Sequence, residues 1–317
     1  GHGSKIRRIN SRRMSERMKQ MKNNVLLVLT ALIWGCSFVA QSVGMDYVGP
    51  FTFNAVRCLI GAAVLIPVIL FMDKSARKSG LTDEEMKSRR GDTKTLVTGG
   101  ICCGLALGIA SSLQQWGILF TTVGKAGFIT AMYIVLVPIF GIFLGKKVRL
   151  LIWFCVALAV AGLYFLCMNE TFRLNTGDFL VILCAVCFSV HILVIDHFSP
   201  KVDGVRLSAI QFLVAGIACG IPMLIWEHPE LPGILAASMP LLYAGVMSCG
   251  VAFTLQIIAQ KNADPTVASL LLSLESVFSV LAGWVILHQS LSIRESFGCV
   301  LMFGAIILAQ LPEKTKA

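Results

Sequence analysis

The chain has 317 residues, of which 56% are hydrophobic and only 14% are charged, and its mean hydropathy is +0.80. Water-soluble domains carry roughly a quarter charged residues, so this composition excludes a soluble globular protein and indicates a chain buried in lipid. The net charge of +10 does not indicate a nucleic-acid partner, because no soluble domain is available to carry a basic binding face.

Residues 1–23 form a basic N-terminal tail ahead of the first apolar segment. Its first four residues, Gly1–Ser4, resemble the remnant of a purification tag, and Met14 is a candidate native start. The apolar segment that follows has about twenty residues, which is long for a signal-peptide core, so we expect it to remain in the protein. Apolar residues such as Met18 and Met21 interrupt the charges of the tail. It would therefore either lie on an anionic leaflet or extend as a flexible tail, and we favour the flexible tail.

Apolar windows of about twenty residues, the length needed to cross a bilayer, recur along the chain between short polar breaks. We therefore predict an all-α polytopic membrane protein with ten transmembrane helices. The predicted spans are 24–44, 50–72, 95–121, 124–145, 148–168, 177–198, 206–226, 236–261, 264–288 and 292–311.

The distribution of Lys and Arg predicts the orientation of these spans. If the N-terminus is cytoplasmic, the inner segments hold most of the basic residues, at Lys5 to Lys22, Lys74 to Lys94, Lys146, Lys147, Arg149, Lys201, Arg206, Lys261, Lys314 and Lys316. The outer segments hold only Lys125, Arg173 and Arg294. Because positive charge collects on cytoplasmic loops, we predict a multi-pass protein of the cell membrane with both termini in the cytoplasm.

The second half of the chain repeats the first. Shifting the segment that begins at Leu255 back by 142 positions aligns it without a gap on the segment that begins at Leu113. An offset of 155 aligns the second span with the seventh, and an offset of 154 aligns the first with the sixth. The aligned pairs include Gln114 with Gln256, Tyr133 with Glu275, Gly61 with Gly216, Pro67 with Pro222, and Trp34 with Phe188.

These two halves, residues 24–168 and 177–311, each hold five predicted spans and are followed by a short tail at 312–317. Five is an odd number, so the halves must cross the membrane in opposite orientations. The predicted fold is therefore two inverted five-helix repeats around a central cavity, an arrangement in which many secondary transporters place the substrate near the midplane.

Glu275 is the strongest candidate for a functional residue, because it lies about ten residues, or roughly 15 Å, into the ninth span. A charge at that depth costs a few kcal/mol or more, and such residues usually face a bundle interior or a wet cavity. Glu275 could bind a substrate amine or take up and release a proton. The alternative is a structural partner for Arg57, an intramembrane charge of the second span, or for backbone donors.

Other polar and aromatic residues of the spans complete the predicted site. Arg57 could hold a substrate carboxylate, although we favour a structural or gating role, and His191 with Asp196 could relay protons, although an interfacial hydrogen bond is favoured. The residues predicted to bind substrate or to couple transport are Trp34, Arg57, Gln114, Gln115, Tyr133, Phe188, His191, Gln256, Glu275 and Ser279.

Three stretches carry a resemblance to a known family. They are the motif WGCSFV from Trp34 to Val39, the intramembrane Arg57 in AVRCLIGA, and the fourth-span block KAGFITAMYIVLVPIFGIFLG. With them, nearly all of 24–311 resembles the EamA family of the drug/metabolite transporter superfamily. The resemblance implies a ten-helix carrier with a central cavity that exports amino acids or other metabolites.

One departure from the family pattern bears on the ends of the fourth and ninth spans. Where the family often has a Gly-Glu pair, this chain has Gly145-Lys146-Lys147 and Leu287-His288-Gln289. Any role of that glutamate therefore does not transfer to this chain.

The predicted function is secondary active export of a small polar metabolite, with amino acids as the leading class, by alternating access across the lipid bilayer. The alternative within the same class is an exchanger or facilitator for nucleotide-type, sugar or cofactor metabolites, and proton coupling and oligomeric state stay open. A membrane-embedded enzyme is the alternative from another class, and a channel is the third.

An ATP-driven pump is not expected, because the chain contains no G-x-x-x-x-G-K-[ST] phosphate loop. An enzyme is not expected either, because the chain contains no H-E-x-x-H or G-x-S-x-G motif and offers one isolated midplane carboxylate in place of a convergent set of nucleophile, acid or metal ligands. No cofactor or metal is expected either. Cys184 and Cys187 form a C-x-x-C pair, but neither His191 nor a second thiol pair completes a zinc set.

Overall fold

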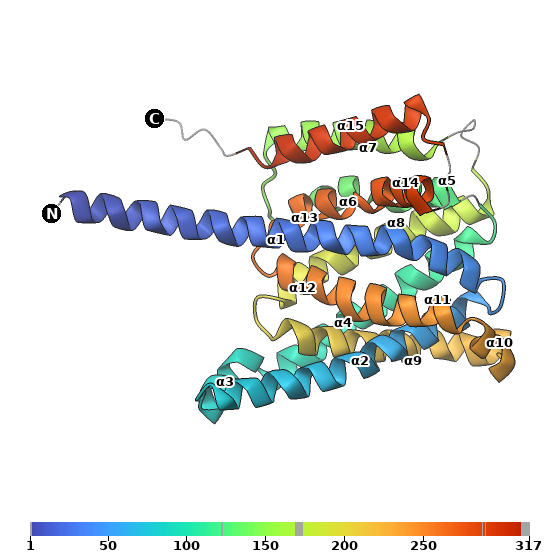
Figure 1. Cartoon of the computed structure of the whole chain (residues 1–317), viewed down its shortest axis with the longest axis horizontal. Coiled ribbons are helices and arrows are strands. Elements are labelled where there is room, and N and C mark those ends of the chain that lie inside the picture. Colours follow the sequence, from blue (N-terminus) through green and yellow to red (C-terminus); the bar gives the residue numbers. More distant parts are fainter. Residues whose placement is uncertain (1, 122, 169–173, 287, 289, 312–317) are drawn as a thin grey trace.

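The computed structural model describes residues 2–121, 123–168, 174–286, 288 and 290–311, and this part of the chain consists of helices and their connections, with no strands (Figure 1). The first half comprises α1 (His2–Gly44), α2 (Pro50–Lys78), α3 (Asp83–Arg90), α4 (Thr93–Ile118), α5 (Val123–Thr130), α6 (Tyr133–Phe143) and α7 (Leu150–Cys167). The second half comprises α8 (Thr176–Phe198), α9 (Gly204–Pro222), the π-helical segment η1 (Met223–Glu227), α10 (Leu231–Ala236), α11 (Ser238–Leu242), the π-helical segment η2 (Tyr243–Phe253), α12 (Thr254–Gln260), α13 (Pro265–Leu272), α14 (Glu275–Ile286) and α15 (Ile293–Ala309).

The predicted all-α membrane fold is confirmed. Within the described residues, nine helical stretches are long and apolar enough to cross a membrane. The tenth predicted span corresponds to α15, which has 17 residues. The short helices α3 and α10 lie in connections between spans. The predicted basic residues Arg173, Lys314 and Lys316 lie outside the described residues, as do Leu287 and Gln289.

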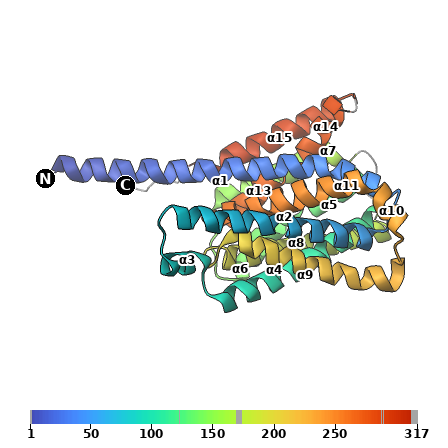
Figure 2. The same ribbon diagram turned by 60° about the horizontal axis from the view of Figure 1, so that its bottom comes forward.

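The basic N-terminal segment is helical, so the expectation of a flexible tail was wrong. Helix α1 runs without interruption for 43 residues and projects beyond the bundle as a straight rod (Figures 1 and 2). The sequence between Gly3 and Gly35 contains neither Gly nor Pro and is rich in Arg, Lys, Met and Leu, which are favourable helix formers. Nothing in the local sequence therefore ends the helix where it leaves the apolar segment.

Close contacts between helices depend on small residues in the bundle. A stripe of glycines on α4 faces α9: a Cβ atom added at Gly100 would lie 2.2 Å from a side-chain carbon of Ile210, and one at Gly104 would lie 2.6 Å from Val214. In the second repeat, Gly216 of α9 packs in the same way against Leu59 of α2. These positions have no room for a side chain, so the backbones approach as closely as small residues allow.

Two predicted spans are interrupted, which the sequence did not lead us to expect. The fourth span divides into α5 and α6 at residues 131–132, and the ninth divides into α13 and α14 at residues 273–274. At each break the backbone tightens to hydrogen bonds between residues three apart, such as Met132 N to Ile129 O at 3.1 Å and Leu274 N to Leu271 O at 3.2 Å. In the ninth span the hydroxyl of Ser273 donates to the Leu270 carbonyl at 2.6 Å, a side-chain bond that competes with regular helix geometry. The two breaks occupy equivalent positions, because 131 plus 142 is 273.

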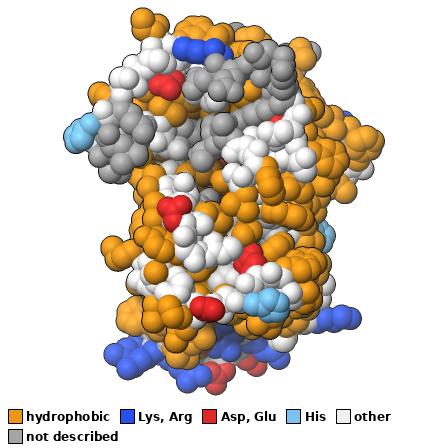
Figure 3. All heavy atoms as spheres, turned by 90° about the vertical axis from the view of Figure 1, so that its right-hand side faces the viewer, with side chains coloured by type: hydrophobic (Ala, Val, Ile, Leu, Met, Phe, Trp, Pro, Cys, Tyr) orange, Lys and Arg blue, Asp and Glu red, His pale blue; other side chains and the backbone are white. Residues whose placement is uncertain are grey.

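The two ends of the described chain lie at the same end of the bundle. The side chain of Asn24, in α1, donates to Gln310, just after α15, at 2.8 Å. The projecting part of α1 and the charged helix α3 lie at this end as well (Figure 1). Figure 3 looks at the opposite end, where hydrophobic and uncharged side chains dominate, carboxylates are scattered, and most Lys and Arg lie at the lower rim. The basic residues of the α1 extension and of α3 thus share one end of the bundle.

Candidate functional site

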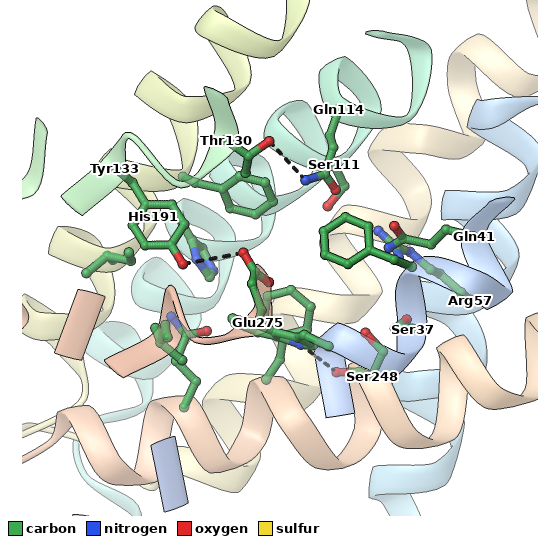
Figure 4. A pocket seen from close by; sticks show the side chains of 17 residues that line it. Ser37, Gln41, Arg57, Ser111, Gln114, Thr130, Tyr133, His191, Ser248 and Glu275 are labelled. Carbon is green, nitrogen blue, oxygen red and sulfur yellow. Dashed lines mark hydrogen bonds between the residues drawn. The ribbon is translucent and has the colours of Figure 1, made fainter. Parts of the chain in front are cut away.

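A cavity of about 50 Å³ lies inside the bundle between the two repeats (Figure 4). A volume of this size holds a few water molecules, so the helices must separate before a metabolite can enter. The lining residues are Trp34, Ser37, Phe38, Gln41, Arg57, Ser111, Gln114, Thr130, Tyr133, Phe188, His191, Ile192, Ser248, Phe253, Gln256, Leu272 and Glu275.

Most of this lining is built from equivalent positions of the two repeats. Adding 154 to a position in α1, or 142 to a position in α4 to α6, gives a second lining residue for seven of the residues contributed by the first repeat. The pairs are Trp34 with Phe188, Ser37 with His191, Phe38 with Ile192, Ser111 with Phe253, Gln114 with Gln256, Thr130 with Leu272, and Tyr133 with Glu275. The cavity therefore lies on the pseudo-symmetry axis that relates the inverted repeats, where such carriers place their binding sites.

Glu275 is the first residue of α14, immediately after the break in the ninth span, and only 8% of its surface is exposed. Its repeat partner Tyr133 is the first residue of α6, immediately after the break in the fourth span. The hydroxyl group of Tyr133 donates to Oε1 of Glu275 at 3.4 Å. The two interrupted helices thus bring equivalent residues into contact across the axis, as the dashed line in Figure 4 shows.

Arg57, from α2, supplies the positive charge of the cavity and is 3% exposed. No hydrogen bond or ion pair joins its guanidinium group to another described residue, and its Nε atom is buried without a partner. Its Cζ atom lies over the ring of Phe53, 5.7 Å from the ring centre. Figure 4 shows Arg57 among the residues that line the cavity. The structural ion pair that we considered between Arg57 and Glu275 is not formed in the described part of the chain.

Six of the polar atoms that line the cavity are buried and have no hydrogen-bond partner in the described structure. They are Ser37 Oγ, Gln41 Oε1, Arg57 Nε, Ser111 Oγ, His191 Nδ1 and Gln256 Oε1. More than nine in ten buried polar groups in proteins have a partner, and each group without one costs about 1–3 kcal/mol. Their concentration around one cavity indicates a space that polar molecules normally fill.

His191 is held by Gln211 of α9, whose Oε1 lies 2.9 Å from the ring Nε2. An amide oxygen only accepts, so Nε2 carries the proton in this pair, and Nδ1 of a neutral ring is left as an acceptor. Asp196 does not line the cavity and instead forms an ion pair with Lys146. The relay from His191 to Asp196 therefore has no support from this arrangement.

Aromatic residues supply much of the apolar lining of the site. Trp34 packs on Phe253 with 4.6 Å between ring centres, and its indole nitrogen donates to the carbonyl of Ser248 at 3.5 Å. Ser248 belongs to η2, and π-helical segments are frequent at functional sites. Phe38 and Phe188 also line the cavity.

The structure places eight of the ten predicted residues around the cavity and leaves two outside. Gln115 is buried behind it and donates to the carbonyl of Gln41 at 3.4 Å, because it is rotated by about 100° from Gln114. Ser279 is half-buried and lies one turn beyond Glu275. The contribution of any of the ten residues to binding stays a prediction.

Several lining residues were not identified from the sequence, among them Ser37, Gln41, Ser111, Thr130 and Ser248. Small polar residues are common where membrane helices pack, so they carry no signal of their own. The alignment of the two repeats could have identified Ser37, because it occupies the position equivalent to His191. In the described part of the chain, no group of three or more His, Cys, Asp and Glu residues is arranged to hold a metal ion.

Comparisons with known proteins agree with this architecture. A protein called "Uncharacterized transporter" from Archaeoglobus fulgidus is 29% identical over 300 residues, which cover 94% of this chain and 88% of that protein. "Uncharacterized transporter YoaV" from Bacillus subtilis is 22% identical over 289 residues, which cover 89% of this chain and 94% of that protein. A solved crystal structure with 20% sequence identity superposes with a TM-score of 0.72 and covers 91% of this chain and 96% of its own, which shows a shared fold. The family description "EamA-like transporter family" matches residues 21–168 and 175–311, and the chain therefore belongs to the EamA-like transporter family.

Proposed function

We propose that this transporter is a secondary active exporter of amino acids that works by alternating access. The observation that carries this proposal is the pair of opposite charges in one cavity. Glu275 and Arg57 both line it, both are buried, and neither has an ion-pair partner among the described residues.

A zwitterion is the ligand class that neutralises both charges at once. An uncompensated buried charge costs on the order of 3–5 kcal/mol, so a substrate ammonium group at Glu275 and a carboxylate at Arg57 would each relieve such a cost. A purely anionic metabolite, such as a sugar phosphate, would meet the carboxylate of Glu275. A purely cationic one would meet the guanidinium group of Arg57.

The remaining lining suits the rest of an amino acid. The aromatic lining residues Trp34, Phe38, Phe188 and Phe253 offer apolar surface for an uncharged side chain, as small-molecule sites usually do. The unpartnered oxygen and nitrogen atoms around it offer hydrogen bonds. The lining contains one carboxylate and no metal-binding set among the described residues, which favours transport over catalysis.

Alternating access is supported by the position of the cavity between inverted repeats and by the two interrupted helices. Interrupted spans at a repeat interface are characteristic of secondary carriers. The basic residues gathered at one end of the bundle support a cytoplasmic location for that end, and hence for both termini, in a cell membrane.

Glu275 also suits a role in proton coupling. It is the one acidic residue that lines the cavity in the described part of the chain, and it receives a hydrogen bond from Tyr133. A proton and a substrate ammonium group would compete for this carboxylate. If the proton replaces the substrate on one side of the membrane and the substrate replaces the proton on the other, proton movement in one direction is coupled to substrate movement in the opposite direction.

The test is flux of a panel of labelled amino acids through proteoliposomes, with and without an imposed pH gradient, for the wild type and Glu275→Gln. The proposal predicts gradient-driven flux that Glu275→Gln abolishes while the protein stays folded. Glu230→Gln is the matched control, because Glu230 is exposed and does not line the cavity.

Each other outcome changes the proposal in a defined way. Full retention of flux in Glu275→Gln would exclude this residue as the coupling site. Saturable flux that ignores the gradient would indicate a facilitator or an exchanger. Absence of flux for every amino acid would direct the assay to nucleotides, sugars and cofactors.

A further inference from the structure

A second cavity, of about 540 Å³, opens at the end of the bundle that holds the N-terminal extension of α1. We call it the basic groove. It lies between that extension, the connection before α7, the start of α13 and the end of α15. Its polar lining residues are Arg17, Gln20, Lys147, Arg149, Asp264 and Gln310.

The groove presents mainly hydrogen-bond donors. Arg17 and Lys147 are exposed, and neither has a hydrogen bond or ion pair to another described residue. The Nε2 group of Gln310 is buried without an acceptor, while its Oε1 accepts from Asn24 at 2.8 Å. Arg149 is held at the rim by the carbonyl of Leu311, 3.3 Å from its guanidinium group.

The single acidic residue of the lining is already engaged. The Oδ1 atom of Asp264 accepts from the backbone N–H groups of Thr266 at 2.9 Å and Val267 at 3.2 Å, at the start of α13. The first turn of a helix stabilises such a carboxylate. In contrast, α7 starts at the groove with no side-chain cap, so its free N–H groups add to the positive potential.

The groove lies at the level where a membrane span ends. Leu150, the residue after Arg149, is 85% exposed, and Phe154 one turn further along α7 is 58% exposed. Exposed apolar side chains on a transmembrane helix face lipid tails, and basic residues just beyond them lie level with the lipid headgroups. A ligand in the groove is therefore reached more directly from the membrane surface than from bulk solvent.

We propose that the basic groove binds the headgroup phosphate of an anionic phospholipid, with Arg17 and Lys147 as its main contacts. Three features favour a negatively charged group at the bilayer surface. The lining presents mainly hydrogen-bond donors, its one carboxylate already accepts from the start of α13, and the groove lies level with the lipid headgroups. This site is separate from the central cavity and does not depend on which substrate is carried.

The test is native mass spectrometry of the purified full-length chain, with phosphatidylglycerol titrated into the detergent solution. A basic residue beside an anionic headgroup contributes about a fivefold increase in affinity, so Arg17→Gln with Lys147→Gln, which removes two such contacts from the groove, should weaken the tightest phosphatidylglycerol site by about 25-fold. The control is Lys19→Gln with Lys22→Gln, which also removes two positive charges, both from residues of α1 that do not line the groove. This control should change the affinity for phosphatidylglycerol less than twofold. Equal melting temperatures of the lipid-free proteins verify that both variants are folded.

Competition experiments distinguish a lipid headgroup from a soluble phosphate as the ligand. Phosphatidylcholine should not compete, and inorganic phosphate and glycerol phosphate should compete only weakly. Equal losses in the two double variants would mean diffuse attraction by the charged surface and would overturn the groove as a site. Inorganic phosphate that binds as tightly as phosphatidylglycerol, and is lost in Arg17→Gln with Lys147→Gln, would assign the groove to a soluble anion and overturn the lipid.

Discussion

The replacement Arg57→Gln tests whether the guanidinium group in the central cavity binds the carboxylate of the substrate or only supports the bundle. Arg57 is 3% exposed and has no ionic partner in the described part of the chain. A carboxylate that enters the cavity would form a desolvated charge pair with it. Loss of one member of such a pair costs about 2–5 kcal/mol, which corresponds to a dissociation constant about 30-fold to several thousand-fold higher.

The assay compares leucine with two analogues, each of which lacks one of its two charged groups. Leucine carries both charges, leucinamide lacks the carboxylate, and 4-methylpentanoate lacks the ammonium group. Binding is measured by competition with a labelled amino acid, for the wild type, Arg57→Gln and Glu275→Gln. Each pairing of a ligand deletion with a protein deletion forms a cycle that isolates one contact.

We expect Arg57→Gln to weaken leucine by at least about 30-fold and to leave leucinamide unchanged or bound more tightly, because a repelling charge is gone. Glu275→Gln should show the opposite pattern and spare 4-methylpentanoate. If Arg57→Gln weakens leucine and leucinamide by the same factor, the guanidinium group acts through helix packing. The assignment of Arg57 to the substrate carboxylate would then be refuted.

Three further predictions concern packing, an outer contact and the pair on the pseudo-symmetry axis. Gly104→Ala should lower the melting temperature, because overpacking against α9 costs about 1–3 kcal/mol. Gly220→Ala is the control and should be neutral or stabilising, because nothing lies within 4 Å of an added Cβ. Equal melting temperatures of the two variants would contradict the close contact between α4 and α9. Glu227→Gln should cost about 1 kcal/mol, because Glu227 accepts from two backbone N–H groups at the start of α2 at 2.8 and 2.7 Å; the exposed Glu230→Gln should be silent in the same melting assay. Tyr133→Phe removes the hydroxyl group that donates to Glu275 at 3.4 Å. This variant should alter the pH dependence of flux and keep the binding of 4-methylpentanoate. An unchanged pH profile would show that the hydrogen bond between Tyr133 and Glu275 has no part in coupling.

Arg57 also breaks the symmetry of the site, which bears on how the repeats cooperate. Its repeat equivalent is Phe212, since 57 plus 155 is 212, and Phe212 is fully buried and packs on Phe253 with 5.9 Å between ring centres. The lining is thus largely symmetric in the positions that build it and asymmetric in charge. In the proposed alternating-access cycle, the symmetric positions would allow two related conformations, and the asymmetric charge would hold the substrate in one orientation.

Much of this architecture follows from the sequence by itself. The cost of placing polar backbone in lipid makes a span of about twenty apolar residues a helix, so hydropathy alone is enough to locate the ten spans. The duplication gave the inverted topology from the odd number of spans in each half. It also aligned Tyr133 with Glu275, which meet in the folded protein.

The details of the site were decided by tertiary structure. The breaks before Tyr133 and Glu275 were not predictable from hydropathy, because each of the two spans is long and apolar enough to be read as one membrane helix. Gln114 and Gln115 are adjacent and chemically identical, yet only the first faces the cavity, since the rotation of a helix is set by its neighbours. The absence of an ion pair between Arg57 and Glu275 likewise depends on where their helices lie. Apolar composition places a segment in the membrane, but which side of it faces a cavity is determined by the packing of helices from both repeats.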